Sequence, residues 1–368
     1  MIFIITVKEK VCSFDSLYKA MKKCKKNVMW KDSVQGYYKN GLVNIHELRK
    51  SLLDGKYKID KYTEFKIFEP KERNIVATRL KDRVFQRSLC DNYVYEAITK
   101  SFIYDNCACQ KNKGTEFGRK RMKAHLQRFY RKHKTQGYIL KLDIKNYFGS
   151  TPHAIAKAAV AKRVKDEWAC SEVFKVIDSY KGDKGLGLGS ELSQLIQLAV
   201  LDDLDHYIKE QLKIKHYIRY MDDMILIHHS KSYLKKCLEK IEERLEALGL
   251  KVNIKKTQIF PVKQGVKFLG FKYKLTDSGK VAMTLLKQKG NREKRKLKRL
   301  VKRSQNGKMT RLQVDRCFES FIAYISNSKR HVERCCLKLI NNFKHYYSEL
   351  WGGANGFNRN AGKSHGSG

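Results

Sequence analysis

The sequence predicts an α+β fold in which an antiparallel sheet presents acidic side chains and an all-helical segment follows. The run His216–Ile227 has β-rich apolar residues on both sides of Met221-Asp222 and no proline, a pattern typical of a hairpin. The run Tyr138–Ile144 is apolar and of strand length. From Leu285 onward a basic helical pattern with a narrow apolar stripe indicates a separate helical segment.

The charge of the chain indicates a polyanionic partner. The net charge of +41 results from 78 lysines and arginines against 37 acidic residues, and the excess is spread along the 368 residues. Because 42% of the residues are hydrophobic, the chain can build a core, which excludes a disordered basic tail. The spread favours an extended track for a nucleic acid, whose binding should weaken steeply with salt.

The compartment can also be predicted. No segment approaches the roughly 20 apolar residues of a membrane span, and Met1–Val7 is too short for a signal peptide and lacks a leading basic region. The ten cysteines include no CxxC pair, and Cys107-x-Cys109 and Cys335-Cys336 have the wrong spacing for structural zinc. We therefore expect reduced cysteines in a cytoplasmic protein with no membrane partner.

The remaining elements follow from periodicity and end signals. Helices are expected over 12–30, 42–54, 82–99, a basic stretch after Thr115, 154–165, 193–212, 234–248, 310–326 and 329–349. Strands are expected over 62–68, 73–77, 250–257 and 266–271. The predicted domains are an N-terminal helical extension (1–60), two middle regions (61–137 and 138–284), a helical domain (285–350) and a disordered tail (351–368), whose last three residues are typical of a cloning remnant.

Three aspartates are the candidate catalytic residues. Asp222 and Asp223 are adjacent at the hairpin, where like charges raise each other's pKa unless a cation lies against them, and Asp143 in a buried strand needs a metal or a hydrogen-bond network. The alternative for the pair is a solvated hairpin tip, where aspartate is common. If one sheet brings all three together, they can hold two Mg²⁺ ions about 3.5–4 Å apart, the two-metal arrangement of polymerases.

Two further segments suit contact with a phosphorylated ligand. The strands before and after Pro70 make a hairpin whose tip carries Lys71 and Arg73, and such basic groups can fold over a triphosphate. The alternative is an ordinary charged turn. The loop Gly182–Gly189 holds four glycines, which permit close backbone approach to a ligand or a sharp turn.

The order of these pieces resembles a reverse transcriptase over roughly residues 12–350. The matching motifs, in family order, are the basic hairpin with Lys71 and Arg73, Asp82-Arg83-x-x-Gln86, Asp143-Ile144-Lys145-Asn146-Tyr147-Phe148, Gly189-x-x-x-Ser193-Gln194, Tyr220-Met221-Asp222-Asp223, Lys256-Thr257 and Phe268-Leu269-Gly270-Phe271. The resemblance implies a right-hand polymerase, with fingers over 61–137, a palm with an antiparallel sheet over 138–284, and a helical thumb over 285–350 that grips template and primer.

The resemblance also implies residue roles. Asp143, Asp222 and Asp223 are implied as catalytic metal ligands, with Ile144 among the metal-binding residues. Phe148 is implied as the aromatic gate that clashes with a ribose 2′-OH; its alternative is an ordinary core residue. The other implied nucleotide-binding residues are Lys71, Arg73, Tyr147, Leu188, Gly189, Gln194 and, as a pyrophosphate-side acid, Lys256. The implied primer and template residues are Tyr220, Met221, Phe268, Leu269, Gly270, Lys294 and Lys298.

Within the family, the subgroup signal lies near Leu188. The motif ends in Ser193-Gln194 where retroviral and intron enzymes usually have Ser-Pro, and Leu188 stands where those enzymes usually carry Gln. These features, with the turn Cys107–Thr115, resemble bacterial diversity-generating retroelement enzymes and related group II intron-like enzymes, in which the aliphatic residue is tied to loose discrimination opposite template adenine. Gly189-Ser190-Glu191-Leu192 departs from the Gly-Asn-Leu-Thr usual in that subgroup.

The expected function is therefore an RNA-directed DNA polymerase that makes cDNA from a structured RNA. The implied cofactors are two Mg²⁺ ions, with Mn²⁺ as a substitute. The implied partners are the RNA template, the cDNA or primer, dNTPs and a small accessory protein, in a bacterial or phage-encoded cytoplasmic system. The alternatives are an antiphage-defence or retron-like reverse transcriptase and a non-catalytic RNA-binding protein on the same scaffold, although all three acids are intact.

Overall fold

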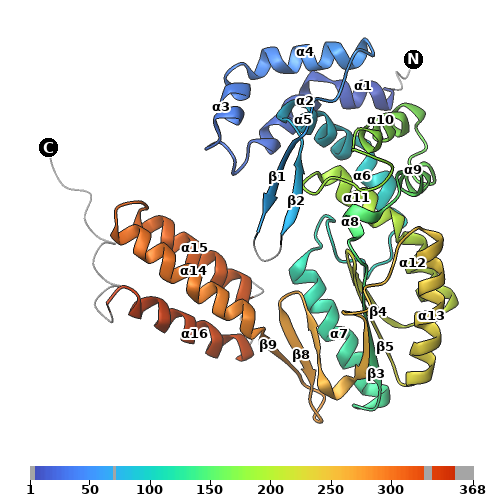
Figure 1. Ribbon diagram of the computed structural model, residues 1–368, viewed down its shortest axis with the longest axis vertical. Helices are drawn as coiled ribbons and strands as arrows, with labels where there is room; N and C mark the ends of the chain where they lie inside the picture. Colours follow the sequence, from blue (N-terminus) through green and yellow to red (C-terminus); the bar gives the residue numbers. More distant parts are fainter. Residues whose placement is uncertain (1–4, 69–71, 327–333, 353–368) are drawn as a thin grey trace. The chain divides into compact units, whose positions relative to one another are not determined.

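The computed structural model describes residues 5–68, 72–326 and 334–352 (Figure 1). The chain forms two compact units that are interleaved in sequence. The first unit comprises Met1–Gly114 and Leu140–Ile259, and the second comprises Thr115–Ile139 and Phe260–Gly368. This division reflects only which residues pack together. It does not test the predicted boundaries of the fingers, palm and thumb, which stay predictions.

Helices dominate the first unit. They are α1 (Val7–Cys12), α2 (Phe14–Cys24), α3 (Asp32–Lys39), α4 (Gly41–Leu53), α5 (Leu80–Leu89), α6 (Tyr95–Thr99), α8 (Tyr147–Ser150), α9 (His153–Ala161), α10 (Glu167–Asp178), α11 (Glu191–Val200), α12 (Asp202–His206) and α13 (Lys231–Ala247). Side-chain caps fix several helix starts: Ser13, Asp166, Ser190 and Ser230 each accept a hydrogen bond from the backbone three residues ahead. Single π-helical turns, η1 (Cys90–Val94) and η2 (Tyr207–Gln211), extend α5 and α12.

The predicted basic hairpin is present. Strand β1 (Thr63–Ile67) pairs antiparallel with β2 (Arg73–Ala77), and the register places Ile67 opposite Arg73. Arg73 therefore lies at the start of β2, next to the hairpin tip. The predicted nucleotide ligand Lys71 lies outside the described residues.

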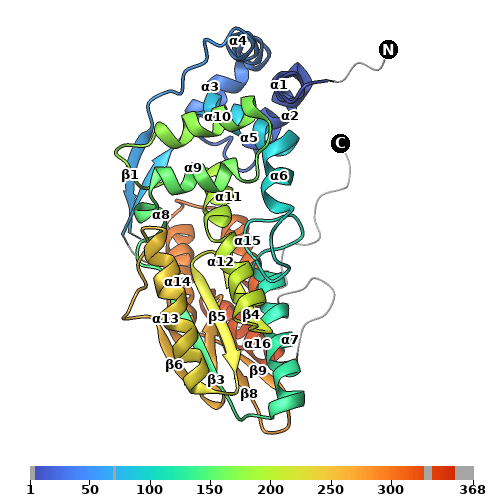
Figure 2. The same ribbon diagram turned by 90° about the vertical axis from the view of Figure 1, so that its right-hand side faces the viewer.

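The sheet that carries the carboxylates has the strand order β4 (His216–Tyr220), β5 (Asp223–His228), β3 (Tyr138–Asp143), β6 (Gln258–Pro261). Its middle strands are apolar and buried, and helix α13 packs against β5 (Figure 2). Burial on this scale gives the sheet a rigid frame. Because β5 and β3 are neighbours, the sheet brings the strand that starts at Asp223 beside the strand that ends at Asp143, as the sequence predicts.

Some predicted elements are wrong in extent. The strand expected over 250–257 is absent: Val252 forms only an isolated bridge with Ile144, and Lys256 and Thr257 donate backbone hydrogen bonds to the Asn253 carbonyl in a turn. The turn forms because the Asn253 N–H bonds to the Asp143 carbonyl, which no local pattern reveals. The long helix expected over 193–212 is broken at Leu201, whose ψ of 3° ends α11.

The second unit contains α7 (Thr115–His133), a short 3₁₀ turn η3 (Val262–Gln264), a three-stranded antiparallel sheet and three further helices. The sheet order is β7 (Val266–Phe268), β8 (Phe271–Leu275), β9 (Val281–Leu285), and α7 packs against β8 and β9. Helix α15 (Arg311–Ser326) packs against α14 (Lys287–Gln305) and α16 (Arg334–Glu349).

The α+β class and the helical segment after Leu285 are thus confirmed. The predicted tail lies outside the described residues from 353 onward. Among the described helices, none has the length and apolar character that crossing a membrane requires.

Candidate active site

The hairpin places two carboxylates at the end of the central sheet. Tyr220 pairs with Asp223, so Met221 and Asp222 form a two-residue turn. Met221 has φ of 56°, in the left-handed region where a residue with a Cβ is strained. Such strain persists only when the surroundings hold it, and it is concentrated at functional sites.

A buried arginine holds this turn. Arg219 and Asp205 are both 0% exposed, and Arg219 Nε donates to Asp205 Oδ1 over 2.7 Å. The same guanidinium donates through Nη1 to the Met221 carbonyl over 3.1 Å, and Tyr217 completes the group by donating to Asp205 Oδ1. Sequence reasoning missed this group. The available signal was an arginine inside an apolar strand, which needs a buried partner.

Asp143 has the hydrogen-bond network that its burial demands. It ends β3 and is 9% exposed. Its Oδ2 accepts hydrogen bonds from Asn253 Nδ2 at 2.9 Å and from Lys256 Nζ at 2.6 Å. Lys256, predicted from the family motif, is therefore placed directly against a predicted catalytic residue. Asn253 was missed, because its side chain reaches Asp143 through a turn that the sequence pattern misassigns.

The other two carboxylates share an electrostatic environment with Asp143. Burial raises the pKa of Asp223 to about 6 against the opposing effect of Lys141, and the charges of Asp222 and Asp143 add to the increase. Burial and then the charge of Asp143 raise the pKa of Asp222, while Lys256 and Arg73 oppose the rise. Asp143 is therefore close enough to Asp222 and Asp223 for its charge to raise the pKa of both.

The donor atoms fit a hard divalent cation, although they are not assembled around one. No group of three or more His, Cys, Asp or Glu in the described part of the chain is arranged to hold a metal ion. Lysines neutralise two of the carboxylates instead: Lys256 at Asp143 and Lys141 at Asp223, the latter over 3.2 Å. Asp223 Oδ1 is buried and has no hydrogen-bond partner among the described residues. Carboxylate oxygens are the ligand type that Mg²⁺ prefers, and this Asp223 oxygen has no hydrogen bond in the described part of the chain that would compete with an ion.

A cleft of about 850 Å³ in the first unit collects three of the predicted nucleotide-binding residues. Arg73 from β2, Phe148 from α8 and Leu188 from the Gly-rich loop all line it. Lys181 and Lys184 add positive charge to the wall. A cleft of this size is within the range of small-molecule sites, and its cations suit an anionic ligand such as a triphosphate.

The glycines of the loop serve close packing at this cleft. A Cβ on Gly187 would lie 2.5 Å from the Tyr180 ring, which is too close for any side chain. Tyr180 in turn stacks on Tyr62, with ring centroids 5.0 Å apart, and donates or accepts a hydrogen bond at Ser193. The two predicted interpretations of the loop were a close approach to a ligand and a sharp turn. For Gly187 the structure gives a different reason, which is close packing against the Tyr180 ring.

Other predicted residues lie elsewhere in the first unit. The Tyr147 side chain is buried and its hydroxyl donates to the Gln197 carbonyl, so the phenol does not line the cleft. Gln194 Oε1 accepts a hydrogen bond from Cys109 Sγ at 3.1 Å, and the same sulfur lies 3.9 Å from Met221 Sδ. The turn after Cys107 therefore contacts the hairpin that carries Asp222 and Asp223. Ile144 is buried, Tyr220 is half-buried at the end of β4, and Gly189 faces a second, smaller pocket.

The predicted primer and template residues Phe268, Leu269 and Gly270 form a tight turn in the second unit. Phe268 pairs with Phe271, and Leu269 and Gly270 have φ of 45° and 85°. The Tyr324 hydroxyl donates to the Leu269 carbonyl over 2.9 Å, and the buried Arg119 guanidinium lies 4.1 Å from the Tyr324 ring centroid. The turn is therefore held by residues far away in sequence, which local patterns do not indicate.

The two predicted lysines of the helical domain lie on α14. Lys294 Nζ is 4.7 Å from the Tyr346 ring centroid, and Lys298 is exposed. Helix α14 has basic residues on its exposed face and Leu297, Leu300 and Val301 buried, as its sequence pattern predicts.

Paired carboxylates at a hairpin, a third at the neighbouring strand and a basic cleft in the same unit are the features that nucleotidyl transfer of the polymerase type uses. The family model for reverse transcriptase (RNA-dependent DNA polymerase) matches residues 66–273, more than half of the chain. The chain belongs to the reverse transcriptase family, whose members generally use divalent metal ions.

Two solved structures are similar to this chain, and the first has a TM-score above 0.5. Telomerase from Candida albicans, in complex with a TWJ fragment of telomeric RNA, is 12% identical and superposes with a TM-score of 0.51 over 78% of this chain and 54% of that one. Apo telomerase from Candida tropicalis, truncated from its C-terminal domain, is 15% identical with a TM-score of 0.47 over 67% and 60% of the two chains. The chain thus spans between half and about three fifths of these two proteins. No curated protein matches it. The family match and the similarity to the Candida albicans structure confirm the predicted right-hand polymerase fold.

Proposed function

We propose that this chain is an RNA-directed DNA polymerase that makes cDNA from a structured RNA, with Asp143, Asp222 and Asp223 as its catalytic residues. The observation that carries the proposal is the position of these three aspartates: Asp143 ends β3, Asp223 starts the neighbouring strand β5, and Asp222 lies in the turn before it. The charge of Asp143 raises the pKa of both Asp222 and Asp223. Ionised carboxylates in such a cluster are stable only with cations nearby, and this is the kind of site that two-metal nucleotidyl transfer needs.

Each remaining residue has a role that its position supports. Bound at these aspartates, two Mg²⁺ ions, or Mn²⁺ in their place, would supply charge neutralisation and lower the pKa of a primer 3′-hydroxyl. Arg73 at the cleft offers a bidentate fork to the phosphates. Phe148, which lines the same cleft, excludes a ribose 2′-OH. Lys256, next to Asp143, donates a proton to the leaving pyrophosphate.

We assign the enzyme to a bacterial or phage-encoded diversity-generating retroelement that acts in the cytoplasm with a small accessory protein. Support comes from Leu188, which lines the same cleft as Phe148 and Arg73. An aliphatic residue at the nucleotide offers no hydrogen bond with which to test the incoming base, and a site without such a bond discriminates poorly. Adenine-directed mutagenesis is the expected consequence.

The test is to purify the protein with its co-bound RNA, add dNTPs and Mg²⁺, and sequence both the RNA and the DNA product. The control is Asp222→Asn, which keeps the side-chain size but removes the charge. Asp203→Asn serves as a matched variant, because Asp203 is an exposed aspartate on α12. Loss of DNA synthesis by about 10²-fold or more in Asp222→Asn alone is expected.

The product decides the biological role. DNA complementary to the RNA with substitutions concentrated at template adenines supports the retroelement assignment. Faithful, repetitive or untemplated DNA contradicts that assignment and favours the defence or retron-like enzyme. Equal synthesis by wild type and Asp222→Asn, or RNA retention with no DNA at all, contradicts the polymerase and favours the RNA-binding protein.

A further inference from the structure

The turn between α2 and α3 presents an exposed aromatic residue on an ordered frame. Trp30 is 73% exposed, whereas Trp168 and Trp351 are only partly exposed. The turn is built by successive backbone hydrogen bonds, among them Val28 N to Lys25 O and Lys31 N to Val28 O. The Gln35 side-chain amide also donates to the Met29 carbonyl over 2.8 Å. Because the backbone beside the indole is fixed, the ring can receive a flat ligand at a small entropic cost.

Lysines lie beside the Trp30 ring and the nearby Tyr38 ring. Lys25 Nζ lies 3.8 Å from the Tyr38 ring centroid and Lys31 Nζ lies 5.2 Å from the Trp30 centroid. Lys26 is exposed and has no ion-pair partner in the described part of the chain. The only acidic residue between Lys22 and Lys39 is Asp32. Interleaved ammonium groups and aromatic faces are the arrangement with which proteins bind single-stranded nucleic acids.

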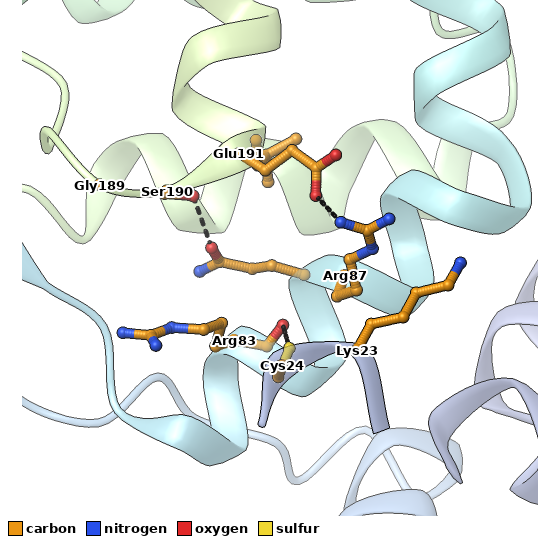
Figure 3. Close-up of a pocket in the computed structure, with 9 residues that line it drawn as sticks. Lys23, Cys24, Arg83, Arg87, Gly189, Ser190 and Glu191 are labelled. Carbon is orange, nitrogen blue, oxygen red and sulfur yellow. Dashed lines mark hydrogen bonds and ion pairs between the residues drawn. The ribbon is translucent and has the colours of Figure 1, made fainter. Parts of the chain in front are cut away.

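A pocket lined by Lys23, Arg83 and Arg87, of which Lys23 and Arg87 pair with Asp91, adjoins the turn. It has a volume of about 160 Å³, and the end of α2 lines it through Lys23 and Cys24 (Figure 3). Arg83 and Arg87 from α5 line it as well; Arg87 pairs with Glu191, whereas Arg83 has no carboxylate partner among the described residues. Gln86, on the same wall, is buried and its Nε2 lacks a hydrogen-bond partner.

One wall of the pocket continues along the chain from the nucleotide cleft. Its other wall is the segment Gly189–Leu192, which directly follows Leu188 of the cleft. All of these residues belong to the first unit. A strand that leaves the cleft beside Leu188 is therefore next to Gly189, a residue of the pocket wall.

We propose that Lys25–Lys31, with the adjoining pocket, binds single-stranded RNA: a base stacks on Trp30, and phosphates lie at Lys25, Lys26 and Lys31. The apolar area is too small for a stable protein interface, since Trp30 and Met29 are the exposed apolar residues of the turn. One part of the inference rests on the proposed function, namely that the bound strand is the template segment that has not yet been copied.

The first experiment measures binding without catalysis. Fluorescence anisotropy with a labelled 12-mer oligo(U) reports affinity for wild type, Trp30→Ala, Trp30→Phe and the double variant Lys26→Glu/Lys31→Glu. We expect Trp30→Ala to weaken binding roughly 5- to 150-fold, which corresponds to one lost stacking contact, and Trp30→Phe to restore most of it. The double variant should also have a shallower salt dependence.

Two matched variants test specificity. Lys240→Glu reverses a charge on the exposed face of α13, and Leu42→Ala removes an exposed apolar side chain from α4. Neither should change the affinity. Equal losses in Lys240→Glu, or unchanged binding in Trp30→Ala, would overturn the inference. Equal affinity for oligo(dT) would overturn the assignment to RNA, and loss of a co-purifying protein without loss of RNA binding would assign the turn to a protein partner.

The second experiment uses primed templates with either a long or a one-nucleotide unpaired 5′ extension. We expect Trp30→Ala to raise the KM for the long template more than the KM for the short one, with kcat the same for both. An equal rise in both KM values would overturn the assignment to uncopied template. Because the binding assay needs no DNA synthesis, failure of the polymerase proposal and failure of this inference give different results.

Discussion

Lys256 Nζ lies 2.6 Å from Asp143 Oδ2, so an ammonium group occupies the carboxylate oxygen that the proposed divalent ion would use. Because the two cations compete for that oxygen, Lys256→Ala should shift the Mg²⁺ dependence of nucleotide incorporation to lower concentration. If Lys256 also protonates pyrophosphate, kcat at saturating Mg²⁺ should fall by about 10²-fold or more. Steady-state incorporation across a Mg²⁺ titration measures both effects. The neighbouring exposed Lys255→Ala is the control, and an unchanged midpoint would contradict the competition.

The buried pair of Arg219 and Asp205 should dominate the stability of the hairpin. Arg219→Met leaves the Asp205 carboxylate buried without its cationic partner, with the Tyr217 hydroxyl still donating to it, and releases the Met221 carbonyl. The expected loss is about 3–5 kcal/mol in the free energy of unfolding, measured by urea denaturation. Lys157→Met, which removes a partly exposed pair with Asp178, should cost about 1 kcal/mol or less. A change of the same small size in Arg219→Met would refute the assignment.

Phe148 should determine the choice of sugar. Phe148→Ala removes the ring from the cleft wall, so a ribonucleotide no longer meets it. We expect the ratio of kcat/KM for a dNTP over the matching rNTP to fall by roughly tenfold or more. Tyr147→Phe is the control, because its buried hydroxyl only donates to the Gln197 carbonyl. It should lower stability by about 1 kcal/mol and leave the ratio as it is.

Leu188 should set fidelity opposite adenine. Leu188→Gln introduces a side-chain amide into the cleft that is able to hydrogen-bond a nucleotide. We expect fewer substitutions opposite template adenines and little change opposite the other bases, counted by sequencing cDNA from one defined RNA. Leu312→Gln, at an exposed position on α15, is the control. An identical spectrum in Leu188→Gln and wild type would disprove the link.

His206 should make stability depend on pH. The hydrogen bond that His206 Nδ1 donates to Glu210 Oε1 is the first cause that raises the pKa of His206 above its ordinary 6.5. Since the folded state then binds the proton more tightly than the unfolded state, this contribution is complete below about pH 6.5 and is lost as the pH rises through the folded-state pKa. The melting temperature should therefore fall less between about pH 6 and pH 8 in His206→Gln than in wild type. Parallel curves would contradict this.

Sequence reasoning placed Asp143 and Asp223 on neighbouring strands because both lie in apolar runs of strand length with no proline. The same alternation misled the prediction at Val252 and Asn253. There the backbone is hydrogen-bonded to the end of β3, because Asn253 N donates to the Asp143 carbonyl. A pattern of side chains records which faces are buried and does not record such a long-range backbone bond.

The residues that hold the turns at Met221 and Leu269 could not be predicted from the local sequence either. Asp205 reaches Arg219 from a different element, and Tyr324 reaches Leu269 across 55 residues. Neither pairing leaves a local periodic signal, and either polar residue alone is compatible with a surface position. An arginine in an apolar strand indicates only that some buried partner exists.

The interleaving of the two units has a consequence for how the protein is made. The backbone passes from one unit to the other after Gly114, after Ile139 and after Ile259. On the ribosome the first unit therefore cannot close until residue 259 has emerged, and α7 must wait for strands synthesised more than 100 residues later. If the backbone is cleaved at one crossing, the other two crossings still join the two units covalently. Neither unit is one continuous stretch of sequence, so neither can be expressed as an uninterrupted fragment.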